Sequence, residues 1–178
     1  MGIGFSKPAE QQVAGTLSVG DRAPSLPGVQ SSAKKFVAFL RHSGCPFAEA
    51  TIKSMRHFSS KYPDIEFVAV THGDDEITRN WLDNIGGTAG ITHIHDDTRV
   101  LHGRWGIGFS DRKHFTGLDT LASVFLLLFK GIRNREDTGT RWQRSATFYV
   151  DVNSTVIWAH EAEKAHDLPD IGQAIANH

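Results

Sequence analysis

The feature that most constrains the fold is a continuous apolar run, Phe-Val-Ala-Phe-Leu, at residues 36–40. A short run of this kind is typical of a strand that is buried on both faces, as in a parallel sheet. Apolar residues then recur at three- and four-residue spacing over residues 47–61, which predicts a helix, and residues 65–70 form a second apolar strand. Because a strand–helix–strand unit joins parallel strands by a right-handed crossover, the sequence indicates an α/β protein.

Further helices and strands are predicted around this unit. We expect helices over residues 74–84, 96–105, 117–130 and 167–176, the last with Asp167 as its N-cap. Short strands are expected over residues 90–95, 147–150 and 156–159, and the last two form a hairpin. The helix over residues 117–130 is apolar nearly all round, so it needs cover from the core, a partner subunit or a bound apolar molecule.

This order predicts one domain over residues 1–178. Its central mixed sheet is flanked by helices, and a helical insertion precedes the last strand hairpin. Residues 1–18 are expected to form a flexible N-terminal arm, because the chain up to residue 34 is rich in loop-forming residues.

Charge and cysteine content narrow the classes of partner. The chain carries 19 basic and 20 acidic residues, and this balance gives no electrostatic case for nucleic acid or an anionic membrane. The single cysteine, Cys45, excludes an intrachain disulfide and a closed multi-cysteine zinc site. One unpaired thiol suits a reducing compartment, so a cytoplasmic location is expected. We expect no cofactor, and a homodimer is one possible assembly.

The chemistry is expected in the loop over residues 41–47, which joins the carboxyl end of a buried strand to the start of a helix. Ligands of open α/β sheets gather at that end of the strands. The free N–H groups and the positive dipole end of a helix N-terminus favour the thiolate of Cys45, and Arg41 and His42 add donors and charge beside it. The alternative is an inert, buried cysteine that packs the strand–helix junction.

The segment Phe-Leu-Arg-His-Ser-Gly-Cys-Pro-Phe-Ala at residues 39–48 resembles the active-site segment of peroxiredoxin-like proteins in the alkyl hydroperoxide reductase/thiol-specific antioxidant group, which often read Phe-Leu-Arg-x-x-Gly-Cys-x-x-Cys. Residues 19–24, 105–108, 131–135, 141–143, 147–151, 158–160 and 166–169 are also similar to that group. The resemblance covers roughly residues 18–172. It implies a thioredoxin-like fold and reduction of hydroperoxides through Cys45.

The chain departs from the family pattern at five positions. The second cysteine of Cys-x-x-Cys is Ala48, so dithiol exchange is excluded. Typical peroxiredoxins carry Pro-x-x-x-Thr/Ser-x-x-Cys, and here the proline position is Ala38 and the hydroxyl position is His42. The family's late arginine falls at Ser145, and the proline that faces the cysteine falls at Ala146. If the resemblance holds, the cysteine strand lies between strands 65–70 and 147–150.

Two functional hypotheses follow. In the first, the protein is a one-cysteine thiol peroxidase: Cys45 attacks a hydroperoxide, Arg41 and His42 assist, and an external thiol regenerates the enzyme. In the second, a non-redox isomerase, cyclase or dehydratase acts on an apolar small molecule in a sizeable pocket between Cys45 and the helix over residues 117–130, with His42 or His72 as its acid–base group. A redox-inert binding protein is a third reading. The residues expected to bind substrate are Phe47, His72, Trp105, Trp142, Arg144 and Thr147.

Other polar residues point less specifically to a function. His93 and His95 lie on one face of a predicted strand and could bind a metal if His102 or Asp96 supplied a third ligand. The alternative interpretation is an exposed pair at a sheet edge or strand end. His160 and His166 are expected at the surface. A basic segment could clamp an oxygen-rich substrate or form a solvated loop; its members are Arg133, Arg135, Arg141, Trp142 and Arg144.

Overall fold

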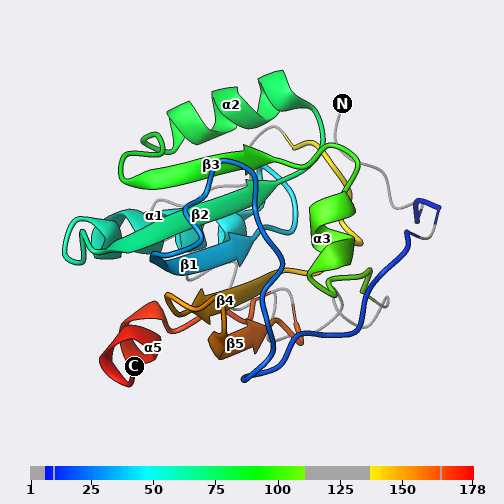
Figure 1. Cartoon of the computed structure of the whole chain (residues 1–178). Coiled ribbons are helices and arrows are strands. Elements are labelled where there is room, and N and C mark those ends of the chain that lie inside the picture. Colours follow the sequence, from blue (N-terminus) through cyan, green and yellow to red (C-terminus); the bar gives the residue numbers. More distant parts are fainter. Residues whose placement is uncertain (1–6, 10, 111–136, 165) are drawn as a thin grey trace.

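The computed structural model describes residues 7–9, 11–110, 137–164 and 166–178, and its centre is a five-stranded sheet in the order β3-β2-β1-β4-β5 (Figure 1). Strands β1 (Lys34–Phe39), β2 (Ile65–Thr71) and β3 (Ile91–His95) are parallel. Strand β4 (Ala146–Val150) pairs antiparallel with β1, and β5 (Val156–Glu161) forms a hairpin with β4. The α/β class and the mixed sheet are therefore as predicted, with the cysteine strand between β2 and β4.

Four helices accompany the sheet in the described residues: α1 (Pro46–Ser59), α2 (Asp75–Asn84), α3 (Val100–Arg104) and α5 (Ile171–Ala176). None of the helices in this described part of the chain is long and apolar enough to cross a bilayer. The helix predicted over residues 117–130, together with Arg133 and Arg135, lies outside the described residues.

Two predicted helix starts were wrong. The last helix begins at Ile171, and its N-cap is Asp170, whose side chain accepts the N–H of Gln173 at 2.9 Å. Pro169 disfavours helical geometry at the residue before it, so the chain from Asp167 to Pro169 cannot be the first turn. The helix expected over residues 96–105 begins only at Val100.

The sheet is covered on both faces. Alternate β1 side chains, Phe36 and Ala38, belong to a core that includes residues of α1, α2 and α5. Val37 and Phe39 belong to a second core with Trp105 and residues of the segment before β1. In Figure 1, α1 lies behind the sheet and α3 lies in front of it. Because both faces of β1 are covered, the carboxyl end of the strand is where we look for a site.

Candidate active site

The single thiol lies where the buried strand β1 gives way to α1. Gly44 has a φ of 81°, which turns the chain, and Cys45 is the extended N-cap residue of α1 with φ −71° and ψ 128°. Pro46 follows in the first turn, where the N–H it lacks has no helical partner. Cys45 is only 2% exposed and has no side-chain capping bond. The sulfur is therefore held at the positive end of the helix, away from solvent.

The surroundings of Cys45 favour its ionised form. Burial raises the pKa of the thiol. The positive charge and hydrogen bond of His42, the charge of Arg41 and the backbone N–H of Ala48 lower this pKa, and together they outweigh the effect of burial. The net effect lowers the pKa of Cys45 from 9.0 to about 6. Burial lowers the pKa of Arg41, while Cys45 raises it. At neutral pH the thiol is therefore mostly thiolate.

Arg41 and His42, the two basic neighbours of the thiol, are buried, and each is hydrogen-bonded to a backbone carbonyl. The His42 ring lies with Nδ1 2.8 Å from the carbonyl oxygen of Ser43, to which it donates, so Nε2 is the nitrogen that can give or take a second proton. Arg41 Nε donates to the carbonyl of Arg141 at 3.0 Å. Ser43 is tied to α2 by a 3.0 Å hydrogen bond between its hydroxyl and that of Thr78. These hydrogen bonds hold the loop that precedes Cys45 in place.

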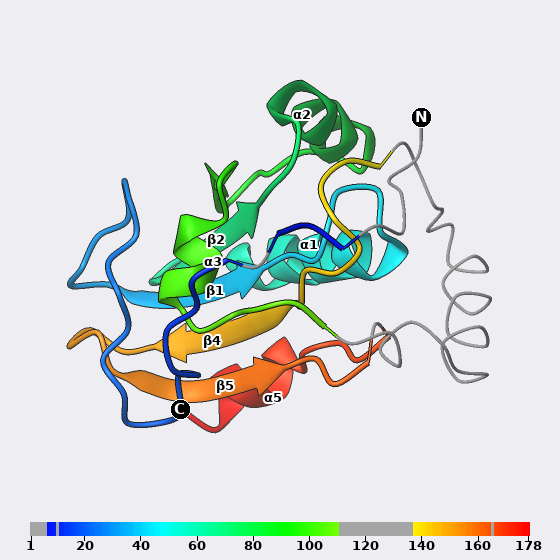
Figure 2. The ribbon, with the colours of Figure 1, turned by 90° about the vertical axis from the view of Figure 1, so that its right-hand side faces the viewer.

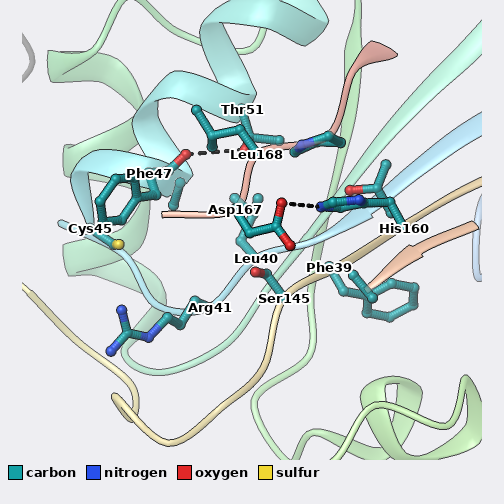
Figure 3. Close-up of a pocket in the computed structure, with 14 residues that line it drawn as sticks. Phe39, Leu40, Arg41, Cys45, Phe47, Thr51, Ser145, His160, Asp167 and Leu168 are labelled. Atoms are coloured by element: carbon teal, nitrogen blue, oxygen red, sulfur yellow. Dashed lines mark hydrogen bonds and ion pairs between the residues drawn. The ribbon is translucent and has the colours of Figure 1, made fainter. Parts of the chain in front are cut away.

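A small cavity adjoins the thiol (Figure 3). It is bounded by the end of β1, the first turns of α1, the start of β4, the end of β5 and the segment before α5. Its volume is about 20 Å³, which is room for roughly one water molecule. The lining residues are Phe39, Leu40, Arg41, Cys45, Phe47, Ala48, Thr51, Ser145, Ala146, Thr147, His160, Asp167, Leu168 and Pro169.

The structure brings some of the predicted substrate-binding residues to this cavity and leaves others elsewhere. Phe47 and Thr147 line it. Trp105 is instead buried in the second core, with its ring 5.2 Å from those of Phe39 and Phe148. Trp142 and Arg144 do not line the cavity either. The Trp142 carbonyl accepts the N–H of Ser110, and the Arg144 guanidinium pairs with Glu161.

His72 lies in a buried polar network beside the site. Its Nε2 accepts the N–H of Thr140 at 3.1 Å, and its ring meets the edge of the His102 ring at a centroid distance of 5.3 Å. His102 Nδ1 donates to the carboxylate of Asp96 at 2.8 Å. Burial, followed by the charges of His102 and His42, lowers the pKa of His72 well below 6.5. His72 is therefore neutral, and it does not line the cavity.

Sequence reasoning missed three polar residues of the cavity: Thr51, His160 and Asp167. His160 was expected at the surface, but its side chain is 22% exposed, stacks on Trp158 and lies 3.5 Å from the Asp167 carboxylate. The available signal was the hairpin register, which pairs His160 with Thr147 and so places it at the same end of the sheet as Cys45. Figure 3 shows the His160–Asp167 pair on the wall formed by β5 and the segment before α5.

The two strand histidines, His93 and His95, have other partners. His93 Nε2 lies 2.7 Å from the Thr71 hydroxyl, and His95 Nδ1 lies 3.8 Å from the carboxylate of Asp75. Asp96 and His102, the third ligands considered, bind each other. Within the described ranges, no three His, Cys, Asp or Glu side chains are grouped so as to hold a metal ion.

No protein-family model and no curated protein matches the chain. Solved structures do match. A peroxiredoxin-like protein from Aquifex aeolicus has a TM-score of 0.63 at 13% identity, over 94% of this chain and 90% of that one. A thiol peroxidase from Chromobacterium violaceum has a TM-score of 0.56 at 15% identity, over 94% and 89%. AhpC of Mycobacterium tuberculosis has a TM-score of 0.55 at 13% identity, over 91% and 96%.

These likenesses define the class of fold. The chain has the thioredoxin-like α/β fold, with the five-stranded mixed sheet found in peroxiredoxin structures. At these identities the likeness concerns the fold alone, so the activity is argued below from the residues around Cys45.

Proposed function

We propose that this protein is a one-cysteine thiol peroxidase, which reduces hydroperoxides through Cys45 and is regenerated by an external thiol. The observation that carries the proposal is the buried thiol at the start of α1, beside Arg41 and His42, with its pKa lowered to about 6. The thiolate is the nucleophilic form of cysteine, and at this pKa it predominates at neutral pH. The peroxiredoxin-like fold supports the same chemistry.

In the first step the Cys45 thiolate attacks the terminal oxygen of the hydroperoxide. A sulfur–oxygen bond forms and the oxygen–oxygen bond breaks, so Cys45 becomes a sulfenic acid and an alkoxide leaves. Protonated His42, which is hydrogen-bonded to the thiol, gives its proton to the alkoxide and yields the alcohol. The Arg41 guanidinium stabilises the negative charge that passes from sulfur to oxygen.

The cavity favours a small substrate. About 20 Å³ is room for roughly one water-sized group, such as the terminal oxygen of a hydroperoxide, and not for a bulky body. The backbone positions that carry arginine and proline in the family are Ser145 and Ala146 here, and both line the cavity. Thr147 adjoins them on β4, so Ser145 and Thr147 bring two hydroxyl-bearing residues to the lining, whereas the family's hydroxyl position before the cysteine is His42 here.

Regeneration needs two molecules of an external thiol. The first attacks the sulfenic acid, releases water and forms a mixed disulfide with Cys45. The second attacks the mixed disulfide, releases the oxidised external thiol and returns Cys45 to its reduced form. Because Cys45 is the only cysteine in the sequence, no thiol of the same chain can replace either molecule.

No feature of the described residues specifically favours the non-redox hypothesis. It predicts a sizeable apolar pocket, whereas the cavity next to Cys45 measures about 20 Å³. The helix over residues 117–130, which that hypothesis makes the other wall, lies outside the described residues. His72, its second candidate acid–base group, does not line the cavity.

The test is addition of hydrogen peroxide to the reduced protein, followed by mass analysis of Cys45 and by peroxide consumption with excess small-molecule thiol. We expect rapid sulfenic acid formation and thiol-dependent turnover, both abolished by Cys45→Ser. The proposal fails if the wild-type protein forms no sulfenic acid and consumes no peroxide.

A matched control moves the thiol away from the site. The double variant Cys45→Ser, Ser60→Cys carries one cysteine at the exposed residue that caps the far end of α1. Its oxidation should be at least about tenfold slower, because an exposed thiol with a pKa near 8.5 is only a few per cent thiolate at neutral pH. Equal rates in the two proteins would show that the surroundings of Cys45 contribute nothing.

A further inference from the structure

A second and larger cavity lies at the opposite end of the sheet from Cys45, with a volume of about 390 Å³. It is formed by the segment before β1, the start of β1 and the β4–β5 turn. The N–H of Ala23 donates to the carbonyl of Ser154 at 2.8 Å, which joins that segment to the turn. Figure 2 shows the blue segment before β1 and the orange β4–β5 turn at the same end of the sheet.

The walls of this cavity combine apolar and polar groups. Leu26 and Val29 contribute to the second core and form an apolar side. Three serines, two cations and the small residues of the loop complete the lining; the serines are Ser25, Ser31 and Ser154, and the cations are Arg22 and Lys35. Small-molecule sites are commonly about 300–1,000 Å³ in volume, and this cavity lies within that range, although polar groups make up more of its lining than apolar ones do.

Lys35 is the unusual residue of the lining. It is only 6% exposed, and it lies on the same face of β1 as the core residue Val37. Its ammonium donates one hydrogen bond, to the carbonyl of Ser31 at 3.2 Å, and makes no ion pair with any described residue. An ammonium has three N–H groups, and a buried charge without a counter-charge is unfavourable. Burial lowers the pKa of Lys35 accordingly, although Glu66 and Asp151 raise it.

The two nearby carboxylates are engaged elsewhere. Glu66 accepts hydrogen bonds from the N–H of Gln30 and the hydroxyl of Thr92, both at 3.3 Å. Asp151 accepts the N–H groups of Asn153 and Thr155 at 2.9 and 2.7 Å, within its own turn. Neither forms an ion pair with Lys35, so neither takes up the other two N–H groups of its ammonium, and the cavity is where a ligand could meet them.

Arg22 adds a second cation at the rim. It is exposed, and its guanidinium makes no hydrogen bond or ion pair with the part of the chain that the structure describes. Arginine and lysine together with serine hydroxyls are the groups that bind phosphate and carboxylate oxygens. The apolar wall of Leu26 and Val29 offers contact to the body of the molecule that carries those oxygens.

We propose that this cavity binds the oxyanion group of a small, partly apolar molecule, with Lys35 and Arg22 as its cationic contacts. The shared chemistry is a phosphate or carboxylate on a body of roughly ring size. The proposal concerns a different end of the sheet from Cys45 and stands independently of the peroxidase proposal.

The test is calorimetric titration of the whole protein with phenyl phosphate and benzoate, and with benzamide as the uncharged analogue. We expect at least one of the two anions to bind and benzamide not to bind. Tighter binding of phenyl phosphate identifies a phosphate ester as the ligand class, and tighter binding of benzoate identifies a carboxylate. The proposal is overturned if neither anion binds, or if benzamide binds as well as they do.

Variants assign the binding to this cavity. Lys35→Met keeps the apolar stem and should weaken anion binding about tenfold or more, since a charge-assisted contact is lost. Lys34→Met, at the neighbouring position on the other face of β1, should bind like the wild-type protein. Arg22→Gln changes an exposed residue and should weaken binding without affecting the fold, so it decides the question if Lys35→Met folds poorly. Unchanged affinity in Arg22→Gln and in folded Lys35→Met would overturn the assignment.

Discussion

At the scale of single residues, His42 is the residue that most distinguishes the surroundings of Cys45 from the peroxiredoxin pattern. Typical peroxiredoxins place a hydroxyl residue three positions before the cysteine, whereas this chain places an imidazole there. The imidazole brings a positive charge and a hydrogen bond to a thiol whose burial would otherwise raise its pKa. A histidine in this position can also supply the proton that the leaving alkoxide needs.

We therefore predict that His42→Gln raises the pKa of the Cys45 thiol from about 6 toward its free value, by about one pH unit or more, because glutamine carries no charge. The measurement is the pH dependence of Cys45 alkylation by iodoacetamide. His57→Gln, which removes an exposed histidine of α1, should leave the curve unchanged. A wild-type curve in His42→Gln would show that His42 does not stabilise the thiolate.

Residues such as His160 show why part of the site escaped prediction. The motif around Cys45 is contiguous, so its members could be recognised from the sequence. His160 is 115 positions away and reaches the cavity only because the hairpin register sets it opposite Thr147, the neighbour of the site on β4. A register one residue different would turn the same side chain to the other face of the sheet.

At the scale of elements, the β1–α1 connection positions the thiol, and Gly44 sets its geometry. Its φ of 81° is a conformation that an L side chain adopts only at a cost. We predict that Gly44→Ala lowers the free energy of unfolding by about 1 kcal/mol and also raises the pKa of Cys45, since the loop must shift the thiol from His42 and the α1 N-terminus. Chemical denaturation and the alkylation curve measure the two effects.

Gly87 supplies the matched control for Gly44. Its φ is 77°, nothing lies within 4 Å of an added methyl group, and it follows α2 rather than preceding α1. Gly87→Ala should therefore cost a similar amount of stability while the thiol keeps its pKa. If Gly44→Ala also leaves the pKa unchanged, the loop conformation does not tune the thiol.

The elements also show where local sequence signals suffice. The first two strands and α1 were predicted to within about two residues, because apolar runs, Pro46 and the change of period mark them directly. The last helix was placed four residues too early, at Asp167 instead of Ile171. An acidic residue before a weak helical pattern fits several starting points. In the structure the Asp167 carboxylate instead accepts the N–H of Glu163 and lies 3.5 Å from His160.

At the scale of the whole molecule, the buried network of His72, His102 and Asp96 links distant parts of the chain. His72 follows β2, His102 lies on α3, and Thr140 of the segment before β4 donates its N–H to His72. All three imidazole and carboxylate groups are nearly inaccessible to solvent. Folding therefore requires His72 to be neutral, and this requirement makes the stability of the whole protein depend on pH.

The sign of that dependence follows from the lowered pKa of His72, which burial causes first and the neighbouring charges of His102, His42 and Arg99 reinforce. Below pH 6.5 the unfolded chain binds a proton at His72 and the folded protein does not, so acid favours unfolding. Stability should fall by up to about 1.4 kcal/mol per pH unit for this one group.

We predict that His72→Gln removes this part of the acid sensitivity. Glutamine keeps an acceptor for the Thr140 N–H but does not titrate, so the variant should lose some stability at neutral pH and show a shallower decline below it. The measurement is the free energy of unfolding in urea between about pH 7.5 and 5.5. His57→Gln, whose imidazole is exposed, should retain the wild-type slope. The same slope in His72→Gln as in the wild-type protein would mean that His72 takes up its proton without unfolding, which its burial in this network argues against.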